Sequence, residues 1–259
     1  MKVLNIKIIL SALIIIIFLV THSFAQFNVY PKVTRMALDS YKGNGFFTLA
    51  NTGKKEVTIV IQVENQWSNK IDDGKKEWLK VQTKEIVLKP EEKKNISYQV
   101  NMNKDMDGEV MAMVYFSKKM EKKKGITLHA RTGCPVYAYR KGTEKIQASM
   151  SEIKIKKAEK GTYHFSMDIT NKGNNYIFPR VYLILDNMKN EGITYSAFSQ
   201  IIPVAPGEER TYSLPWESKD FKGTLKGKVI VLYNLKNVNK RMNRTFDLII
   251  DENGEMRHE

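Results

Sequence analysis

The sequence contains the same pattern twice, about 120 residues apart. Asn51-Thr52-Gly53 ends an alternating apolar stretch in the first half, and Asn171-Lys172-Gly173 ends a similar stretch in the second half. Further along, Lys89-Pro90-Glu91-Glu92 has its counterpart in Ala205-Pro206-Gly207-Glu208. A repeat of this length is typical of two whole domains and is too long for a solenoid or a propeller blade. The chain is therefore expected to contain two similar domains in tandem.

Both halves carry the hydrophobic pattern of β-strands. Apolar residues alternate with other residues in four segments: 57–64, 96–102, 163–170 and 246–250. A period of two places one set in a core and the other set outward. Segments 110–116 and 229–235 are nearly continuous apolar runs, which suit central strands. Turn residues separate the segments, and no mature segment carries a helical stripe. The sequence predicts an all-β fold of two tandem immunoglobulin-like β-sandwich domains, each with about seven strands.

The first 25 residues are typical of a secretory signal peptide. Lys2 and Lys7 precede the apolar run Ile8 to Val20, and Ser23-Phe24-Ala25 offers small residues for cleavage before Gln26. The run has about 13 apolar residues, whereas a spanning helix needs roughly 20. An uncleaved anchor is the alternative. We expect a periplasmic or otherwise exported protein without stable membrane insertion after cleavage.

The domain boundary is expected where polar turn residues interrupt the apolar pattern. Gly142-Thr143-Glu144-Lys145 supplies that interruption. The predicted organisation is a signal peptide at 1–25, a first domain at 26–143, a second domain at 144–251 and a charged tail at 252–259.

Cysteine content and charge limit how the domains are held and what they bind. Cys134 is the only cysteine, so no intramolecular disulfide can form, and we expect it to be a buried small hydrophobe. The formal net charge is +14, and removal of two leader lysines leaves +12. Lysines cluster in predicted loops without aromatic platforms, which argues against nucleic acid as a partner. A basic, solvated surface is expected.

The sequence offers no constellation for catalysis. The histidines after the leader are His129, His164 and His258. None lies at a metal-ligand spacing, and neither a nucleophile elbow nor a phosphate-binding glycine loop is present. We expect no enzyme, no cofactor and no metal. Trp67, Trp78 and Trp216 suit either a carbohydrate site or sandwich cores, and cores are the preferred interpretation.

Four segments of the first half also follow a known order and spacing. They are 29–35 (VYPKVTR), 49–53 (LANTG), 78–90 (WLKVQTKEIVLKP) and 131–137 (RTGCPVY). Together they resemble the N-terminal domain of PapD-type periplasmic pilus chaperones, over roughly residues 27 to 140. The resemblance implies a chaperone that lends a strand to an incomplete pilin-like subunit by β-augmentation. The second domain is more similar to a generic immunoglobulin-like fold.

The resemblance also implies a site for the client's terminal carboxylate. In the family, an arginine near the N-terminus and a lysine on the last strand hold that group, and Arg35 stands at the arginine's position. A guanidinium fork matches a carboxylate well. Counting from Arg131, the lysine's position falls on Gly133, so half of the clamp is expected to be absent. His129 or a lysine of 122–124 are possible substitutes, and a surface arginine supporting the first strand is the alternative for Arg35.

The predicted partner-binding strand comes just before this segment. Ile126, Leu128 and Ala130 alternate as a donating edge strand requires, and an ordinary last strand facing the core is the alternative. The leading hypothesis is a chaperone-like protein that binds an extended segment of a secreted or surface-assembled protein subunit. The rival hypotheses are a structural or adhesive immunoglobulin-like protein that binds anionic surface components, and a carbohydrate-binding module.

Overall fold

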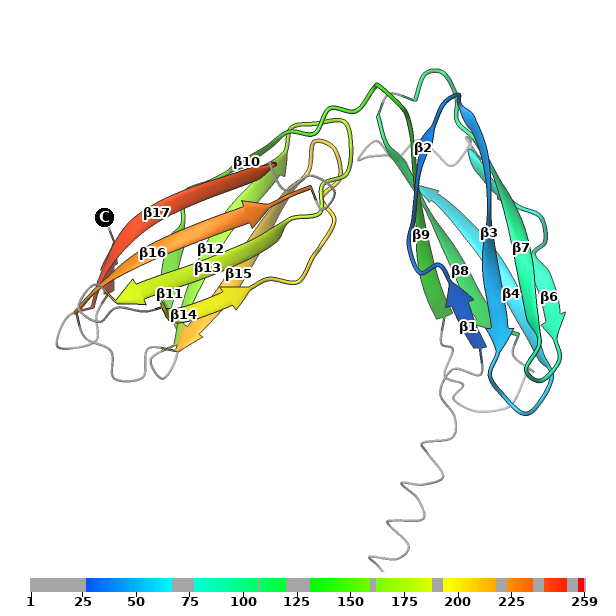
Figure 1. Ribbon diagram of the computed structural model, residues 1–259, viewed down its shortest axis with the longest axis horizontal. Coiled ribbons are helices and arrows are strands. Elements are labelled where there is room, and N and C mark those ends of the chain that lie inside the picture. The colour runs from blue at the N-terminus through cyan, green and yellow to red at the C-terminus, as the bar shows by residue number, and fades with distance from the viewer. Residues whose placement is uncertain are drawn as a thin grey trace, which may run out of the picture. The chain divides into compact units, whose positions relative to one another are not determined.

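A computed structural model describes residues 27–66, 77–106, 108–119, 131–158, 162–187, 193–217, 223–234, 240–250 and 256–258. The regular elements in this part of the chain are β-strands packed as two sandwiches (Figure 1). The predicted all-β fold of two tandem immunoglobulin-like domains is confirmed. The predicted signal peptide lies outside the described residues. Within them, no helix has the length and apolarity to cross a membrane.

Contacts divide the chain into two units. The described parts of 1–66, 72–104 and 111–138 form the first unit. The second unit contains the described parts of 105–110 and of the chain from Tyr139 onward. The division therefore runs between Ala138 and Tyr139, and a short segment before residue 111 groups with the second unit.

The first unit consists of two antiparallel sheets. The β3 sheet has the order β1 (Phe27–Tyr30), β3 (Lys42–Asn51), β7 (Lys93–Asn101) and β5 (Leu79–Val81). The β8 sheet has the order β2 (Thr34–Leu38), β9 (Arg131–Arg140), β8 (Val110–Lys118), β4 (Val57–Gln66) and β6 (Glu85–Leu88). The first strand of the sandwich is thus divided between the sheets, with a cis Tyr30-Pro31 peptide between β1 and β2. This division is one reason why the structure has more strands than predicted.

The core of the first unit follows the predicted alternation. Val57, Ile59 and Ile61 are buried, and the Phe47 ring packs 5.2 Å from the Phe116 ring across the two sheets. Val63 differs from the prediction because it is only half-buried. The strand β6 pairs with β4 only over Val57–Val60, so the end of β4 borders an open groove of about 710 Å³ between β4 and β5.

Two other core predictions for this unit are confirmed. Cys134 is completely buried, and burial raises the pKa of its thiol, as expected for a structural rather than a reactive cysteine. Trp78 is also buried, which excludes it from a surface carbohydrate site. Trp67 lies outside the described residues.

The second unit is built in the same way. In the β12 sheet, β10 (Ala148–Met150) and β11 (Lys154–Lys157) pair with one edge of β12 (Thr162–Asn171), and β15 (Glu209–Glu217) pairs with the other. The β16 sheet has the order β14 (Ile193–Phe198), β13 (Arg180–Asn187), β16 (Gly223–Leu232), β17 (Arg241–Ile250) and β18 (Met256–His258). As predicted from its continuous apolar run, β16 is a central strand.

The core of the second unit confirms the predicted alternation of β12. Tyr163, Phe165, Met167 and Ile169 are all buried. The Trp216 ring lies 5.7 Å from the Tyr163 ring and is itself buried, so the interpretation of this tryptophan as a core residue is confirmed.

The repeated asparagine fixes a turn in the first unit. The Asn51 side-chain amide donates hydrogen bonds to the carbonyls of Lys55, Leu88 and Lys89, at 2.8, 3.1 and 2.9 Å. Its carbonyl oxygen accepts a hydrogen bond from the N–H of Gly53 at 2.9 Å. The side chain is 2% exposed, so it satisfies backbone groups that water reaches poorly.

The second unit repeats these bonds. The buried Asn171 side-chain amide donates to the carbonyls of Asn175 at 2.8 Å and Val204 at 3.0 Å. Its carbonyl oxygen accepts a hydrogen bond from the N–H of Gly173 at 2.9 Å. The sequence repeat therefore corresponds to a repeated hydrogen-bonding device.

The later half of the repeat is also equivalent in structure. The Glu92 carboxylate accepts a hydrogen bond from the N–H of Lys89 at 2.7 Å, and Glu208 accepts one from Ala205 at 3.2 Å. The backbone hydrogen bond from Lys89 lowers the pKa of Glu92, and the side-chain hydrogen bond from Lys94 lowers it further. The residue before each glutamate has a positive φ: 62° at Glu91 and 77° at Gly207.

The stability of the second unit should depend on alkaline pH through Tyr212. Its hydroxyl donates to the carbonyl of Ile202 at 2.8 Å, and burial raises its pKa from 10.0 to about 12. The folded protein therefore keeps this proton to a higher pH than the unfolded chain. The contribution of protonated Tyr212 to the free energy of unfolding should be fully present below pH 10. It should fall by about 2 kcal/mol as the pH rises towards 12.

Urea unfolding at a series of pH values tests this expectation. Tyr212→Phe should lose less stability than wild type over the same interval. Tyr30→Phe, at an exposed tyrosine, is the matched control and should keep the wild-type slope. Equal slopes for Tyr212→Phe and wild type would contradict the assignment.

Candidate functional site

The structure places two of the predicted site positions on neighbouring strands of the first unit. Arg35 lies in β2 and is half-buried, and Gly133 lies in β9 and is exposed. These strands are adjacent in the β8 sheet. The other predicted partner-binding residues, Ile126, Leu128 and Ala130, lie outside the described residues, so the donor strand stays a prediction.

Alternation along β2 defines the side to which Arg35 belongs. The Met36 sulfur lies 3.8 Å from the Tyr98 hydroxyl of β7, in the opposite sheet, and Leu38 is buried. Even-numbered residues of β2 therefore face the core. Because successive side chains of a strand point to opposite faces, Arg35 belongs to the outer face of the β8 sheet.

Gly133 leaves room that side chains of β8 occupy. A Cβ atom built at Gly133 would lie 3.0 Å from the Met113 sulfur and 3.2 Å from the Tyr115 ring. Both side chains are half-buried and belong to the outer face. A lysine at position 133 would require them to shift by a few tenths of an ångström. At Gly133 the outer face is therefore lined by the Met113 and Tyr115 side chains.

Arg131 supplies a positive charge on this same face. Its guanidinium lies 3.8 Å from the centre of the Tyr115 ring, a cation–π arrangement. Its Nη1 is 3.7 Å from Oε1 of Glu64 on β4. Both charged side chains are about half exposed, so their ion pair adds little to stability.

The sequence predictions missed Met113 and Tyr115 because 110–116 is a continuous apolar run. Such a run predicts burial on both faces, whereas β8 alternates between buried and half-buried residues. Residue size gives no clear signal either: Met and Tyr lie outward, but the inward positions hold the large Phe116 as well as Val and Ala. This outer face, with Arg35, Met113, Tyr115, Arg131 and Glu64, is suited to contact with another polypeptide.

Reactive side chains are the other possible basis of a functional site. No group of three or more His, Cys, Asp or Glu side chains in this part of the chain is placed to hold a metal ion. His164 is exposed, and its Nδ1 lies 3.4 Å from the Ser213 hydroxyl.

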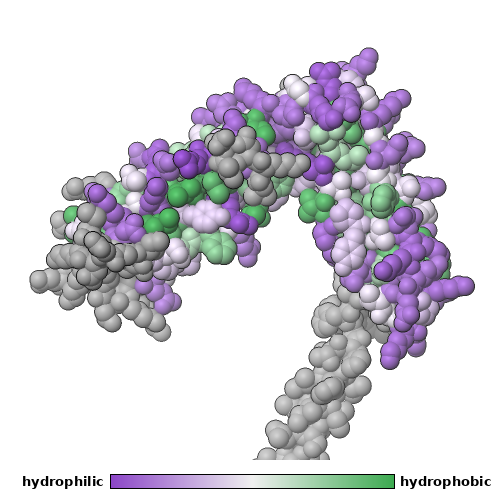
Figure 2. Space-filling model, in the orientation of Figure 1, coloured by the Kyte–Doolittle hydropathy of each residue, from purple (hydrophilic) through white to green (hydrophobic). Residues whose placement is uncertain are grey.

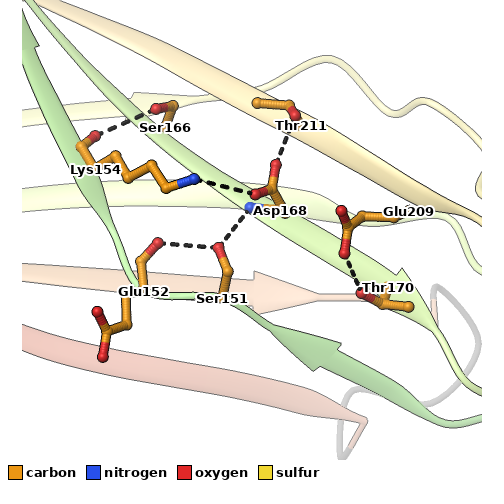
Figure 3. Close-up of polar contacts among 8 residues, drawn as sticks. All are labelled: Ser151, Glu152, Lys154, Ser166, Asp168, Thr170, Glu209 and Thr211. Atoms are coloured by element: carbon orange, nitrogen blue, oxygen red, sulfur yellow. Dashed lines mark hydrogen bonds and ion pairs between the residues drawn. The ribbon is translucent and has the colours of Figure 1, made fainter.

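A polar network covers the outer face of the β12 sheet in the second unit (Figure 3). Asp168 accepts a hydrogen bond from the Thr211 hydroxyl at 2.6 Å and lies 3.8 Å from the Lys154 ammonium group. The Ser166 hydroxyl donates to the carbonyl of Lys154, and the Thr170 hydroxyl donates to the Glu209 carboxylate. These hydrogen bonds connect neighbouring strands of the sheet. Among the residues of Figure 3, no side chain lies beside the Ser166 hydroxyl as a general base would.

Comparisons with known proteins give a likeness of structure. No protein-family model matches the sequence. No curated protein matches it either. The crystal structure of the YadV chaperone is similar, with 11% identity, 85% of this chain and 100% of that chain covered, and a TM-score of 0.50.

Two further similar structures have TM-scores below 0.5. One is the chaperone–tip adhesin complex of CFA/I fimbriae, with 14% identity, 85% of this chain and 98% of that chain covered, and a TM-score of 0.48. The other is the Salmonella enterica SafA pilin in complex with the SafB chaperone, with 10% identity, coverages of 86% and 95%, and a TM-score of 0.44. At such identities the likeness concerns the fold, and the predicted resemblance to PapD-type chaperones is confirmed at that level.

Proposed function

We propose that this protein is a non-enzymatic, chaperone-like binding protein. It engages an extended segment of a secreted or surface-assembled protein subunit through the β9 region of its first unit. The observation that carries the proposal is the outer face of the β8 sheet, where β9 lies between β2, which holds Arg35, and β8, which holds Met113 and Tyr115. The fold shared with the YadV chaperone supports it.

Main-chain hydrogen bonds would supply most of the affinity. Ile126, Leu128 and Ala130 immediately precede β9, and their alternation suits a strand that offers one edge to a client. In such an arrangement the backbone holds the client, and alternate apolar side chains fill its pockets. This mechanism requires no catalytic group.

Charge would fix the register of the client. Arg35 is the candidate for the client's terminal carboxylate, because a guanidinium donates two parallel hydrogen bonds to that group. Gly133 cannot provide a second cation. Arg131, two residues earlier and therefore on the same face of β9, is the substitute that the fold offers.

Substitution of Arg35 should remove the preference for a free carboxylate. The probes are a synthetic peptide of alternating apolar residues with a free C-terminal carboxylate and the same peptide with a C-terminal amide. Wild type should bind the acid more tightly. Arg35→Ala should weaken binding of the acid by roughly 10- to 100-fold, since a hydrogen bond to a charged group contributes about 1.5 to 3 kcal/mol. Fluorescence anisotropy measures both affinities.

Two variants make this test specific. Arg210→Ala removes an exposed arginine of the second unit and should leave both affinities unchanged. Leu128→Glu places a charge on the predicted donor strand and should abolish binding of both peptides. Wild-type binding by Arg35→Ala and Leu128→Glu would overturn the proposed function.

A further inference from the structure

The two outer faces of the second unit differ in chemistry. The β12 sheet presents the polar network around Asp168, whose hydroxyl and carboxylate groups bond to one another (Figure 3). The β16 sheet presents apolar side chains over β13, β14 and β16 (Figure 2). A sandwich needs only its inner faces to be apolar, so an apolar outer face requires a separate explanation.

Strand register places the apolar residues next to one another. Tyr182 is directly opposite Phe198 on one side and Ile230 on the other. Residues that lie opposite one another on neighbouring strands form a row across the sheet. In the rows on either side of Tyr182, on the same face, Leu232 lies opposite Arg180, and Ile184 lies opposite Lys228. We call this continuous patch, formed by Tyr182, Ile184, Phe198, Ile230 and Leu232, the Tyr182 face.

The aromatic residues of the Tyr182 face are accessible to a partner. Phe198 is 68% exposed, and its ring centre lies 6.3 Å from that of Tyr182. The other four members of the patch, including Tyr182, are half-buried, so they lie nearly flush with the sheet. The result is a flat apolar surface with one projecting ring.

The charged residues within the rows of the Tyr182 face are all basic. Arg180 and Lys228 lie in the rows just described, and Arg241 is opposite Leu232 on β17. These three rows contain no carboxylate among their paired residues. Acidic residues begin in the next row, where Asp186 and Asp247 flank Lys226. The Tyr182 face therefore has an apolar centre and a cationic rim.

We propose that the Tyr182 face docks an acidic protein surface with an apolar centre. Tyr, Phe and Arg are enriched at protein interfaces, and the cationic rim selects carboxylates by charge complementarity. A second copy would bring Arg180, Lys228 and Arg241 against a rim of the same charge. A bilayer would require apolar side chains that enter the headgroup layer, whereas all but Phe198 are flush. The site is separate from the strand-binding region of the first unit.

Binding of a defined pair of peptides tests the proposal. The probes are a fluorescein-labelled amphipathic peptide with leucines on one face and glutamates on the other, and its counterpart with lysines in place of the glutamates. Wild type should bind the glutamate peptide and should bind the lysine peptide at least tenfold more weakly. Lys228→Glu/Arg241→Glu should weaken binding of the glutamate peptide at least tenfold. Phe198→Ser should also weaken it.

A matched control changes the same charge elsewhere in the unit. Lys156→Glu/Lys157→Glu alters two exposed lysines of β11 and should keep wild-type affinity. Equal loss in this control, or equal binding of the two peptides by wild type, would overturn the proposal. Binding of phosphatidylglycerol vesicles that depends on Lys228 and Arg241, without binding of the glutamate peptide, would also overturn it. A dimer that is seen by analytical sedimentation and is abolished by Phe198→Ser would overturn it as well. None of these outcomes depends on Arg35 or Leu128, so this test and that of the proposed function fail separately.

Discussion

Replacement of Asn171 by alanine should lower the free energy of unfolding by about 3 kcal/mol. The change removes the donor for the carbonyls of Asn175 and Val204 and the acceptor for the N–H of Gly173. The side chain is fully buried, and each buried polar group left without a partner costs about 1 to 3 kcal/mol. Asn51→Ala should have a similar effect in the first unit. Urea unfolding followed by circular dichroism measures both.

An exposed asparagine provides the comparison. Asn243→Ala, on the solvent side of β17, should change stability by less than about 0.5 kcal/mol. A cost below about 1 kcal/mol for both Asn51→Ala and Asn171→Ala would contradict the view that these side chains hold the turns.

Gly227→Val should destabilise the second unit by about 3 kcal/mol or more. Gly227 lies opposite Phe246 in the pairing of β16 with β17, and the Phe246 ring packs directly on the glycine. A Cβ atom at this position would run into the ring. Since β16 is paired on both sides, the backbone cannot move away without breaking a ladder. Overpacking of this kind costs about 1 to 3 kcal/mol, and the loss of ring packing adds to it.

A double-mutant cycle separates the steric clash from other effects. In a Phe246→Ala background, Gly227→Val should cost less, with a coupling energy of about 1 to 3 kcal/mol. Thr245→Val, at an exposed neighbour of Phe246, should not rescue Gly227→Val. Equal costs of Gly227→Val in both backgrounds would show that the ring is not responsible.

The fold was predictable because its signals are local. A period of two along 57–61 or 163–169 identifies the buried side of a strand from the strand alone, and the repeated asparagine turns indicate two domains. The prediction was less complete where pairing decides burial. Val63 is half-buried because β6 ends before it reaches this residue. The length of β6 cannot be read from the hydrophobic pattern of β4.

The candidate site was less accessible to sequence reasoning. Arg35 was selected by resemblance to a family, and the structure adds its strand and its face. Tyr115 and Arg131 form a pair only because β8 and β9 are neighbours in the sheet. The Tyr182 face depends in the same way on the register of β13 with β14 and with β16, and β16 is separated from both in the chain by β15.

The paired asparagine turns suggest how such a molecule diversifies. Duplicated modules that keep an internal hydrogen-bonding scaffold are free to change at positions that contribute nothing to it. Asn51 and Asn171 preserve the scaffold in both units. The outer face of the β8 sheet in the first unit carries arginine, methionine and tyrosine. The Tyr182 face of the second unit has an apolar centre with basic borders. Exchange of surface residues on the two proposed binding surfaces should therefore alter recognition while the asparagine turns keep each fold intact.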